Sequence, residues 1–382
     1  MPPFRPITIQ DIRGRLVLDS HLAWTPEFEV ELADGRSGIG SAPRGETLSI
    51  YESAGAAGWA AIDRDARTLI GDAHDQATFD AAVERIGSAW GAQATLALSA
   101  AFQQAARDRD AGGTVPRLLL NVLNGGAHAY TNPVRADVPE LMLYARSHDL
   151  VGTIDAYRAF LDVVRAELAT YPIRDVAGNP VHDLGDPPTE RAIELLRRLV
   201  DREGLARTFG VALDASAGDW WDGRAYLLPI EGRHDAPDTL GAWWLSLIER
   251  YGIELLEDPF AEVDRTAWSA LHAARPATCA LLGDNYTSTS VAELIDAGKA
   301  ADIDAVVAKP NQNGTVSGTV AFANAARDAG LELIVSHRSV ETESTFLVDL
   351  AIDVAADGLK IGPFRDFTAV IKANELLRRS RA

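Results

Sequence analysis

The sequence predicts an α/β protein in which a smaller α+β domain precedes a (β/α) barrel. Two observations support this fold class. The first part of the chain combines strand-like alternation with Ala-rich helical spacing, whereas the second alternates apolar strand candidates with amphipathic helices. A chain of 382 residues is long enough for one large domain or two. We place the two domains at residues 1–118 and 119–382.

The N-terminal domain shows two kinds of pattern in turn. Residues 5–35 alternate as strands do, and "FEVELADG" ends in a turn signal, which predicts a short antiparallel meander. Residues 50–110 contain "YESAGAAGWAAI" and "AQATLALSAAFQQAARD", whose apolar spacing predicts helices. Strands followed by helices give the predicted α+β domain.

The second domain repeats a strand and a helix several times. Its helices include "IDAYRAFLDVVRAELATY" and "LGAWWLSLIERY", and its strand candidates include "ELMLYA", "FGVALDA", "GIELLEDPF", "ATCALLGDN", "DAVVAKPNQ", "LELIVSHRS" and "DGLKIGP". Such alternation is typical of parallel βα units, whose strands are buried on both faces. So many units in succession favour a closed barrel over an open sheet.

The composition limits the classes of partner. The net charge of −19 argues against binding to nucleic acid or to an anionic membrane, which both favour a basic surface. The single cysteine, Cys279, excludes an internal disulfide and cysteine-rich metal sites, as is typical of a reducing cytoplasm. The N-terminus lacks a secretory signal pattern, and no apolar run approaches the roughly 18 residues of a membrane helix. We therefore expect a cytoplasmic protein.

Ionisable side chains end six successive strand candidates. They are Asp214, Glu257, Asp284, Lys309, the pair His337 and Arg338, and Lys360. In a parallel barrel the carboxyl ends of all strands meet on one face, so these side chains are expected to converge. Three carboxylates without a thiol or an imidazole suit a hard cation such as Mg²⁺. The alternative is that each carboxylate caps a helix or forms a turn.

Lys309 and Lys360 follow apolar runs and are candidates for proton abstraction or for neutralising substrate charge. Burial can lower the pKa of a lysine towards the range useful for a base, and nearby divalent cations would lower it further. The alternative is a pair of surface lysines at strand ends.

The segments that carry these residues resemble the enolase family. "NVLNGGAHA" is similar to its Asn-Val-x-Asn-Gly-Gly-x-His-Ala segment, "PELMLYA" to its Gln-Glu-Phe-Met, and "LLEDP" to its Glu-Asp-Pro. "AKPNQNGT" resembles Lys-x-Asn-Gln-Ile-Gly-Thr, and "VSHRSVETE" differs from Val-Ser-His-Arg-Ser-Gly-Glu-Thr-Glu at one position. The similarities run in the same order along nearly the whole chain. They imply an enolase-type (β/α)8 barrel behind the smaller domain.

The resemblance also implies a metal and a base. One Mg²⁺ would bind to Asp214, Glu257 and Asp284, and a second would be held by the substrate and by a hydroxyl of a mobile loop, matched by Thr47. Lys309 matches the general base that removes the proton next to the substrate carboxylate.

The remaining matches concern the substrate, which would be of the 2-phosphoglycerate or phosphoenolpyruvate type. Lys360 matches the lysine that contacts the substrate carboxylate. The implied substrate-binding residues are His337, Arg338, Ser339 and Gln312, and His128 and Glu140 match residues that line the leaving-group side. The reaction implied is α-proton abstraction with metal stabilisation of the resulting enolate, in a homodimer or higher homo-oligomer.

The chain departs from the family at the loop that helps to expel the β-hydroxyl. "LGDPPTE" stands in place of Gly-Asp-Glu-Gly-Gly-Phe-Ala-Pro, so Pro187 replaces the Glu, and proline has no ionisable group. His182, Asp183 and Glu190 are the nearby candidates for a replacement. The mobile loop is also changed, with Arg44 and Glu46 at positions where the family has small residues.

Three functions remain open at this point. One is an altered reaction, such as that of carboxyphosphonoenolpyruvate synthase in phosphinothricin-type antibiotic biosynthesis, in which Arg44 would meet an additional anion. The second is ordinary enolase activity. The third is a non-catalytic, enolase-like binding protein, which the retained lysines and carboxylates disfavour because buried charges are costly to keep.

Overall fold

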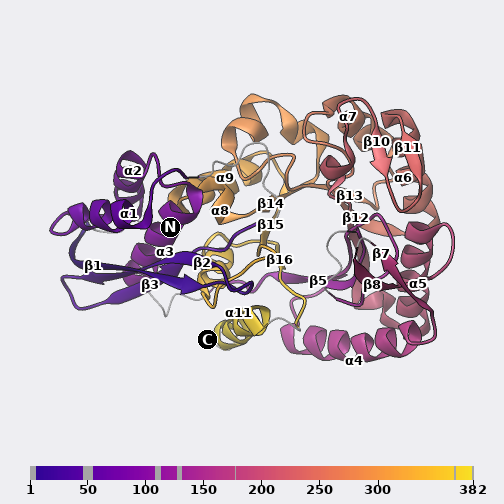
Figure 1. Cartoon of the computed structure of the whole chain (residues 1–382), viewed down its shortest axis with the longest axis horizontal. Helices are drawn as coiled ribbons and strands as arrows, with labels where there is room; N and C mark the ends of the chain where they lie inside the picture. Colours follow the sequence, from indigo (N-terminus) through magenta and orange to yellow (C-terminus); the bar gives the residue numbers. More distant parts are fainter. Residues whose placement is uncertain are drawn as a thin grey trace.

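The computed structural model describes residues 6–45, 55–107, 113–126, 131–176, 178–364 and 367–380. Within these residues, a four-stranded sheet with its helices stands beside a closed eight-stranded barrel surrounded by helices (Figure 1). The predicted fold class is confirmed. The first barrel strand begins at Arg117, so the predicted start of the barrel at residue 119 falls inside that strand.

The N-terminal sheet has the strand order β3-β2-β1-β4, and its first three strands form the predicted antiparallel meander. Its elements are β1 (Ile7–Leu18), β2 (Trp24–Leu32), β3 (Ser37–Ser41), α1 (Trp59–Ala66), η1 (Arg67–Leu69), β4 (Ala73–His74), α2 (Gln76–Ile86) and α3 (Ala92–Ala106). Helix α3 packs very closely on β3. A Cβ atom at Gly40 would lie 2.3 Å from the carbonyl oxygen of Ala97, so only glycine allows this approach.

The barrel closes in the order β12-β13-β14-β15-β16-β5-β6-β9. Its strands are β5 (Arg117–Asn124), β6 (Glu140–Ala145), β9 (Phe209–Asp214), β12 (Ile253–Glu257), β13 (Ala280–Gly283), β14 (Ala305–Ala308), β15 (Glu332–Ser336) and β16 (Gly358–Lys360). Apolar side chains such as Leu119, Leu255 and Ile334 fill its interior. The strands therefore surround a packed core and present their polar ends at one mouth.

Strand β6 corrects the expectation that every barrel strand is parallel. It pairs antiparallel with both β5 and β9, and Glu140 lies opposite Asn124 and Asp214. A parallel crossover normally needs a helix between the two strands, and the described part of segment 125–139 contains none. The apolar pattern of β6 is the same for a parallel and for an antiparallel strand, so the sequence does not reveal that the strand is reversed. Glu140 thus reaches the mouth from the start of its strand.

Helices and two small hairpins complete the barrel. They are α4 (Leu150–Leu168), β7 (Ile173–Val176), β8 (Asn179–His182), α5 (Pro188–Arg202), η3 (Leu205–Arg207), η4 (Ala217–Trp220), β10 (Tyr226–Leu228), β11 (Arg233–Asp235), α6 (Pro237–Tyr251), α7 (Arg265–Ala274), η5 (Ala292–Asp296), η6 (Lys299–Asp302), α8 (Pro310–Asn313), α9 (Val316–Asp328), α10 (Phe346–Asp353) and α11 (Phe367–Arg379). In the described residues, none of the helices has the length and apolar character needed to cross a membrane.

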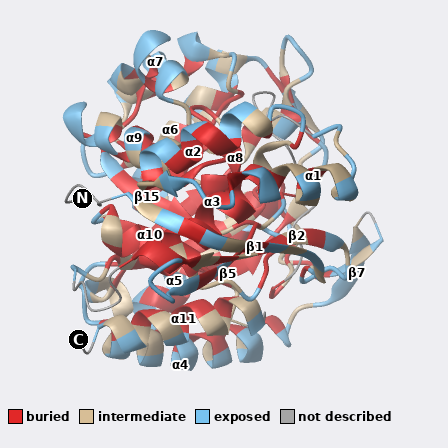
Figure 2. Ribbon diagram, turned by 90° about the vertical axis from the view of Figure 1, so that its left-hand side faces the viewer, coloured by how far each residue is buried: buried red, intermediate tan, exposed pale blue. Residues whose placement is uncertain are grey.

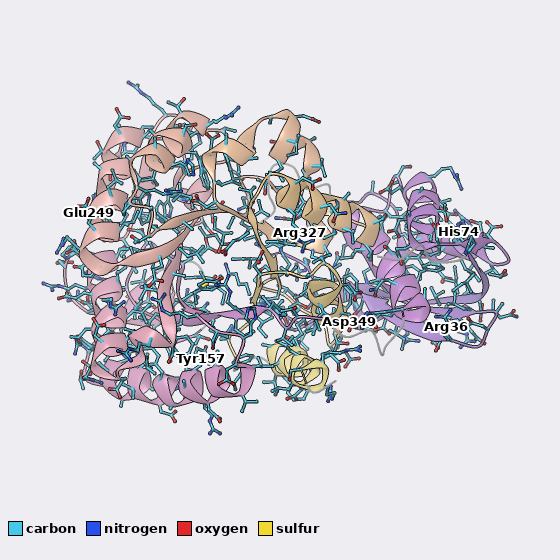
Figure 3. The ribbon with its side chains drawn as sticks, turned by 180° about the vertical axis from the view of Figure 1, so that it is seen from behind. Arg36, His74, Tyr157, Glu249, Arg327 and Asp349 are labelled. Atoms are coloured by element: carbon cyan, nitrogen blue, oxygen red, sulfur yellow. The ribbon has the colours of Figure 1, made fainter. Side chains whose placement is uncertain are left out.

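The two parts of the molecule meet along α3 and α10, which are buried for most of their length (Figure 2). The Arg107 guanidinium follows α3 and pairs with Asp349 at 2.5 Å and Asp353 at 2.9 Å on α10. Asp349 is labelled at this junction in Figure 3. Each of these buried charges therefore has a partner of opposite sign across the boundary between the two domains.

Candidate active site

The ammonium group of Lys360 lies among three carboxylates at the mouth of the barrel. Its Nζ is 2.8 Å from Asp214 Oδ2, 2.8 Å from Glu257 Oε2 and 2.9 Å from Glu140 Oε2. These groups come from the ends of β16, β9 and β12 and from the start of β6. The structure therefore brings together residues that are far apart in the sequence, as predicted.

Two opposing effects act on the pKa of Lys360 in its surroundings of carboxylates. Burial alone would lower it, but the charges of Asp214, Glu140 and Glu257 outweigh burial and raise the pKa well above the ordinary lysine value. Lys360 is therefore suited to act as a fixed positive charge and poorly suited to act as a base.

The two carboxylates nearest to Lys360 respond in opposite directions. Burial alone would raise the pKa of Asp214, but the charge and hydrogen bond of Lys360 lower it to about 2. Burial raises the pKa of Glu257 well above its ordinary value, and the neighbouring charge of Asp214 adds to this increase. The site thus concentrates negative charge that a cation can offset.

Lys309 belongs to the same site and pairs with Asp284, which directly follows β13. Its backbone N–H donates to Thr289 Oγ1 at 2.9 Å, and that hydroxyl donates to Gln312 Oε1 at 2.8 Å. The Gln312 side chain is buried, and its Nε2 has no hydrogen-bond partner in the described structure. The predicted base and Gln312 are therefore held by one hydroxyl, with an amide donor left for a ligand.

Backbone strain surrounds the carboxylates. Ser216, Asp258 and Thr289 have positive φ angles of 42°, 42° and 53°, although none of them is glycine. They follow β9, β12 and β13, the strands that carry the predicted metal ligands. Positive φ is uncommon for such residues and costs about 1–3 kcal/mol where the surrounding structure enforces it. This arrangement is typical of functional sites.

Two of these strained residues hold the carboxylates, and the sequence reasoning missed both roles. Ser216 donates from its backbone N and from Oγ to Asp214 Oδ1, each at 3.0 Å. The carboxylate of Asp258 accepts the backbone N–H groups of Asp284 at 3.0 Å and Asn285 at 2.8 Å. The only signal in the sequence was that Asp258 directly follows Glu257, which points to the role too weakly to assign it.

Asp214, Glu257 and Asp284 suit a hard cation by their chemistry. Among the described residues, no group of three His, Cys, Asp or Glu side chains is arranged to hold a metal ion, and Lys360 and Lys309 pair with these carboxylates. Nevertheless, Oδ1 of Asp284 is buried without a hydrogen-bond partner, and the three carboxylates end neighbouring strands. An all-oxygen donor set fits Mg²⁺, and metal binding stays a prediction.

The His337–Ser339 segment follows β15 at the same mouth. Arg338 is buried, and its backbone N–H donates to Glu341 Oε1 at 2.9 Å while Nη1 reaches Asn311 Oδ1 at 3.4 Å. Burial lowers the pKa of His337 to about 4, so its imidazole is neutral at neutral pH. Ser339 is exposed in the same turn. A buried arginine fork beside a neutral imidazole suits a phosphate ester.

Glu341 anchors this segment. Its second oxygen pairs with Lys372 at 2.8 Å, and its backbone N–H donates to Ser20 in the N-terminal domain at 3.1 Å. Glu343 in the same segment is exposed. The His337–Ser339 segment is therefore anchored by Glu341.

The leaving-group side is only partly described. Glu140 accepts a hydrogen bond from Asn121 Nδ2 at 3.3 Å in addition to its pairing with Lys360. His128 and Thr47, predicted to contact the substrate and a second metal ion, lie outside the described residues, as does Glu46. Their roles stay predictions.

The loop around Pro187 provides no free acid in the described structure. Pro187 is exposed and caps α5. Asp183 pairs with Arg135 at 3.1 Å and with Arg174, and Glu190 accepts from Tyr251 at 2.9 Å and pairs with Arg250 at 2.6 Å. Two of the three predicted replacements for the family Glu are thus engaged elsewhere.

His182 and Arg44 are placed near the mouth by backbone contacts. His182 accepts a backbone hydrogen bond from Arg135 at 3.0 Å, and its Nδ1 is buried without a hydrogen-bond partner in the described residues. Arg44 pairs with Val340 through the backbone, and its guanidinium lies 3.4 Å from Asp19. The role predicted for Arg44, contact with an additional anion, gains no support from this ion pair.

Comparisons with a family profile and with curated proteins both give matches that span most of the chain. The sequence profile described as "Enolase, C-terminal TIM barrel domain" matches residues 113–381, which include every barrel strand. A curated protein named enolase, from Acidothermus cellulolyticus, is 31% identical over 411 residues, and the match covers 97% of this chain and 93% of that protein. The matches therefore span the N-terminal domain as well as the barrel.

Proposed function

Because the chain belongs to the enolase family, we propose that it is a Mg²⁺-dependent lyase that removes the proton α to the carboxylate of a 2-phosphoglycerate- or phosphoenolpyruvate-type substrate. The observation that carries the proposal is the meeting of Lys309, Lys360 and the carboxylates at one barrel mouth, beside buried Arg338. Burying charges of both signs in one site costs desolvation free energy, and such clusters are typical of functional sites.

The two lysines have different tasks in this proposal. A proton α to a carboxylate is weakly acidic because its removal concentrates negative charge on the carboxylate. Lys360, with its raised pKa, remains an ammonium group and faces the substrate carboxylate as a fixed positive charge. Lys309 takes the proton on Nζ as general base. Mg²⁺ bound by Asp214, Glu257 and Asp284 would supply further positive charge beside the substrate carboxylate.

The phosphate would bind on the opposite side of this pocket from Glu140. The Arg338 guanidinium offers a planar pair of donors for phosphate oxygens, and Gln312 Nε2 offers another donor. Neutral His337 and the hydroxyl of Ser339 complete the set. These groups orient the substrate so that its α carbon faces Lys309.

The leaving-group step is proposed to differ from that of ordinary enolases. Pro187 has no acidic group, and the carboxylates of Asp183 and Glu190 form ion pairs with other residues. A carboxyphosphonoenolpyruvate synthase-like reaction is the specific form that we propose. Ordinary enolase activity is the second candidate, favoured by the 31% identity across nearly the whole chain.

A single assay series separates these functions. Purified protein is incubated with 2-phosphoglycerate and Mg²⁺ in deuterated water, with EDTA as control, while phosphoenolpyruvate absorbance and α-proton exchange are followed. Exchange without turnover supports the altered reaction, and robust metal-dependent turnover supports ordinary enolase activity. Absence of both contradicts the proposal and favours a non-catalytic binding protein.

We also propose that the protein is a cytoplasmic homodimer or higher homo-oligomer that binds neither nucleic acid nor membranes. The net charge of −19, the lone buried thiol of Cys279 and the exposed apolar Leu18 and Trp24 at the β1–β2 turn support this proposal. Light scattering that gives a monomer mass would contradict the oligomer, and cell fractionation tests the location.

A further inference from the structure

A cavity of about 710 Å³ opens beside the barrel mouth. One wall is formed by residues on either side of the 127–130 segment, including Arg135 and Pro139, and the other by the residues that follow β9 and by the β10–β11 hairpin. Pro139 directly precedes Glu140, and Ala215 directly follows Asp214. The cavity therefore adjoins two of the carboxylates that surround Lys360.

Buried hydrogen bonds fasten the two walls together. The carboxylate of Asp137 accepts the backbone N–H groups of Ile230 at 3.0 Å and Glu231 at 2.7 Å. The backbone N–H of Asp137 donates to Thr189 at 3.0 Å, and Glu231 in turn accepts the backbone N–H of Thr189 at 2.9 Å. Since both walls are tied to the start of α5, the cavity is formed before any ligand binds.

The charged groups in the walls already have partners. Arg135 pairs with Asp183 and Asp186, and Asp137 is bonded as described above. Asp222 accepts two backbone N–H groups of its own turn and lies 2.9 Å from His234 Nε2. Binding a further charged group would disturb these pairs, so the walls favour a neutral ligand group.

Most of the remaining lining is apolar and partly aromatic, and Asp175, Ser216 and Asp219 complete it. The apolar part includes Trp220, Trp221, Leu227, Ile230 and Pro139. The Trp221 ring packs on Tyr226 with centroids 4.7 Å apart, and Leu227 is 52% exposed although it is a large apolar residue. A volume of this size with apolar walls is typical of small-molecule sites.

We propose that this cavity is a subsite for an apolar substituent, up to the size of an aromatic ring, on the leaving-group carbon of the substrate. The inference rests on the proposed function, because it requires the substrate carboxylate to lie at Lys360 and the phosphate at Arg338. The third carbon of the substrate then points towards Glu140 and Pro139, where the cavity begins. A substrate larger than 2-phosphoglycerate is therefore accommodated without moving the base.

The test compares two probes that differ by one phenyl group, 2-phospholactate and 2-phospho-3-phenyllactate. Neither has a β-hydroxyl, so neither is dehydrated, and calorimetric titration in Mg²⁺ measures binding alone. The phenyl compound is expected to bind about tenfold to a hundredfold more tightly, as burial of an aromatic ring predicts. Leu227→Asp places a charge on the apolar lining and is expected to reduce this preference to about twofold or less. Ile295→Asp, at an exposed apolar position outside the cavity, is the matched control and keeps the preference.

Each outcome bears on the subsite. Equal or weaker binding of the phenyl compound by the wild type overturns it, while binding of 2-phospholactate still supports the proposed function. A preference that survives Leu227→Asp also overturns it. If neither probe binds and 2-phosphoglycerate shows no α-proton exchange, the proposed function fails and the subsite fails with it.

Discussion

The two halves of the barrel mouth are built differently. The half from β13 to β16 carries Lys309 and Arg338 and is braced by the N-terminal domain, whose hydrogen bonds reach segments 311–317, 340–342 and 349–353. The half from β5, β6 and β9 carries Glu140, the loop around Pro187 and the apolar cavity. Proton abstraction therefore has a rigid frame, whereas the leaving-group side can change around it.

The largest effect expected on the rigid half comes from Lys309→Ala. Loss of a positioned base is expected to slow α-proton exchange by about 10²–10⁴-fold. Exchange of the α proton of 2-phosphoglycerate, followed by NMR in deuterated water, checks this value. Lys309→Arg keeps the positive charge but is expected to lose exchange as well, which separates the base from the charge. An alanine variant with full exchange would place the base elsewhere.

Arg338→Ala is expected to have the next largest effect. Removal of a buried fork of charged hydrogen bonds should raise KM for the phosphorylated substrate by at least about 100-fold. Arg338→Lys should restore only part of this loss, because a lysine makes one point contact with the phosphate. Initial-rate kinetics or probe binding measures both variants. An unchanged KM would show that the phosphate binds elsewhere.

Asp80 tests the bracing by the N-terminal domain. This buried carboxylate accepts the backbone N–H of Ser317 at the start of α9 at 2.7 Å and the hydroxyl of Ser99 at 2.6 Å. Burial raises its pKa to about 6, although these hydrogen bonds oppose the increase. The folded state therefore binds this proton more tightly than the unfolded state does, and the stability that the proton contributes is lost as pH rises from about 4 through about 6.

Relative to Asp80→Asn, the free energy of unfolding of the wild type is expected to fall by roughly 2–3 kcal/mol between pH 4 and pH 7. Urea unfolding of both proteins across this pH range measures the difference. Parallel pH profiles would show that Asp80 does not titrate in this range. The contacts between the N-terminal domain and the barrel would then not depend on its charge.

The smallest effect is expected on the variable half, from Glu190→Gln. Glu190 bonds to Tyr251 and Arg250 on the outer helix α6, so its loss should change the exchange and turnover rates by about twofold or less. The same kinetic assays apply. A loss of about tenfold or more in turnover, with exchange unchanged, would identify Glu190 as the acid that replaces the family Glu.

Much of the site could be predicted because its residues follow apolar runs. Asp214, Glu257, Asp284 and Lys360 each follow or end a strand, and a barrel brings such positions together whatever the loops do. The order of the segments and their resemblance to the enolase family then indicated the roles of these residues. The same reasoning identified the His337–Ser339 segment as the candidate phosphate-binding site, because its polar side chains contrast with the apolar strand β15 before it.

The rest depends on spatial neighbours that no local pattern encodes. The raised pKa of Lys360 results from three carboxylates on other strands, whereas burial alone predicts the opposite direction. The supporting roles of Ser216, Asp258 and Thr289 depend on positive φ angles, which a Ser, Asp or Thr in a sequence does not reveal. The cavity likewise forms from segments distant in the chain.

The reversed strand β6 has a topological consequence. Because β6 descends from the mouth, the chain must climb along α4 and descend along α5 before β9 can rise again. The chain therefore returns to the mouth between two helices rather than between a strand and a helix, at the β7–β8 hairpin and the Asp183–Pro187 turn, where His182 pairs with Pro133 and Arg135. This connection between α4 and α5 contains no barrel strand. Evolution can rewrite it to accept new substrates while the strands that hold the base stay untouched.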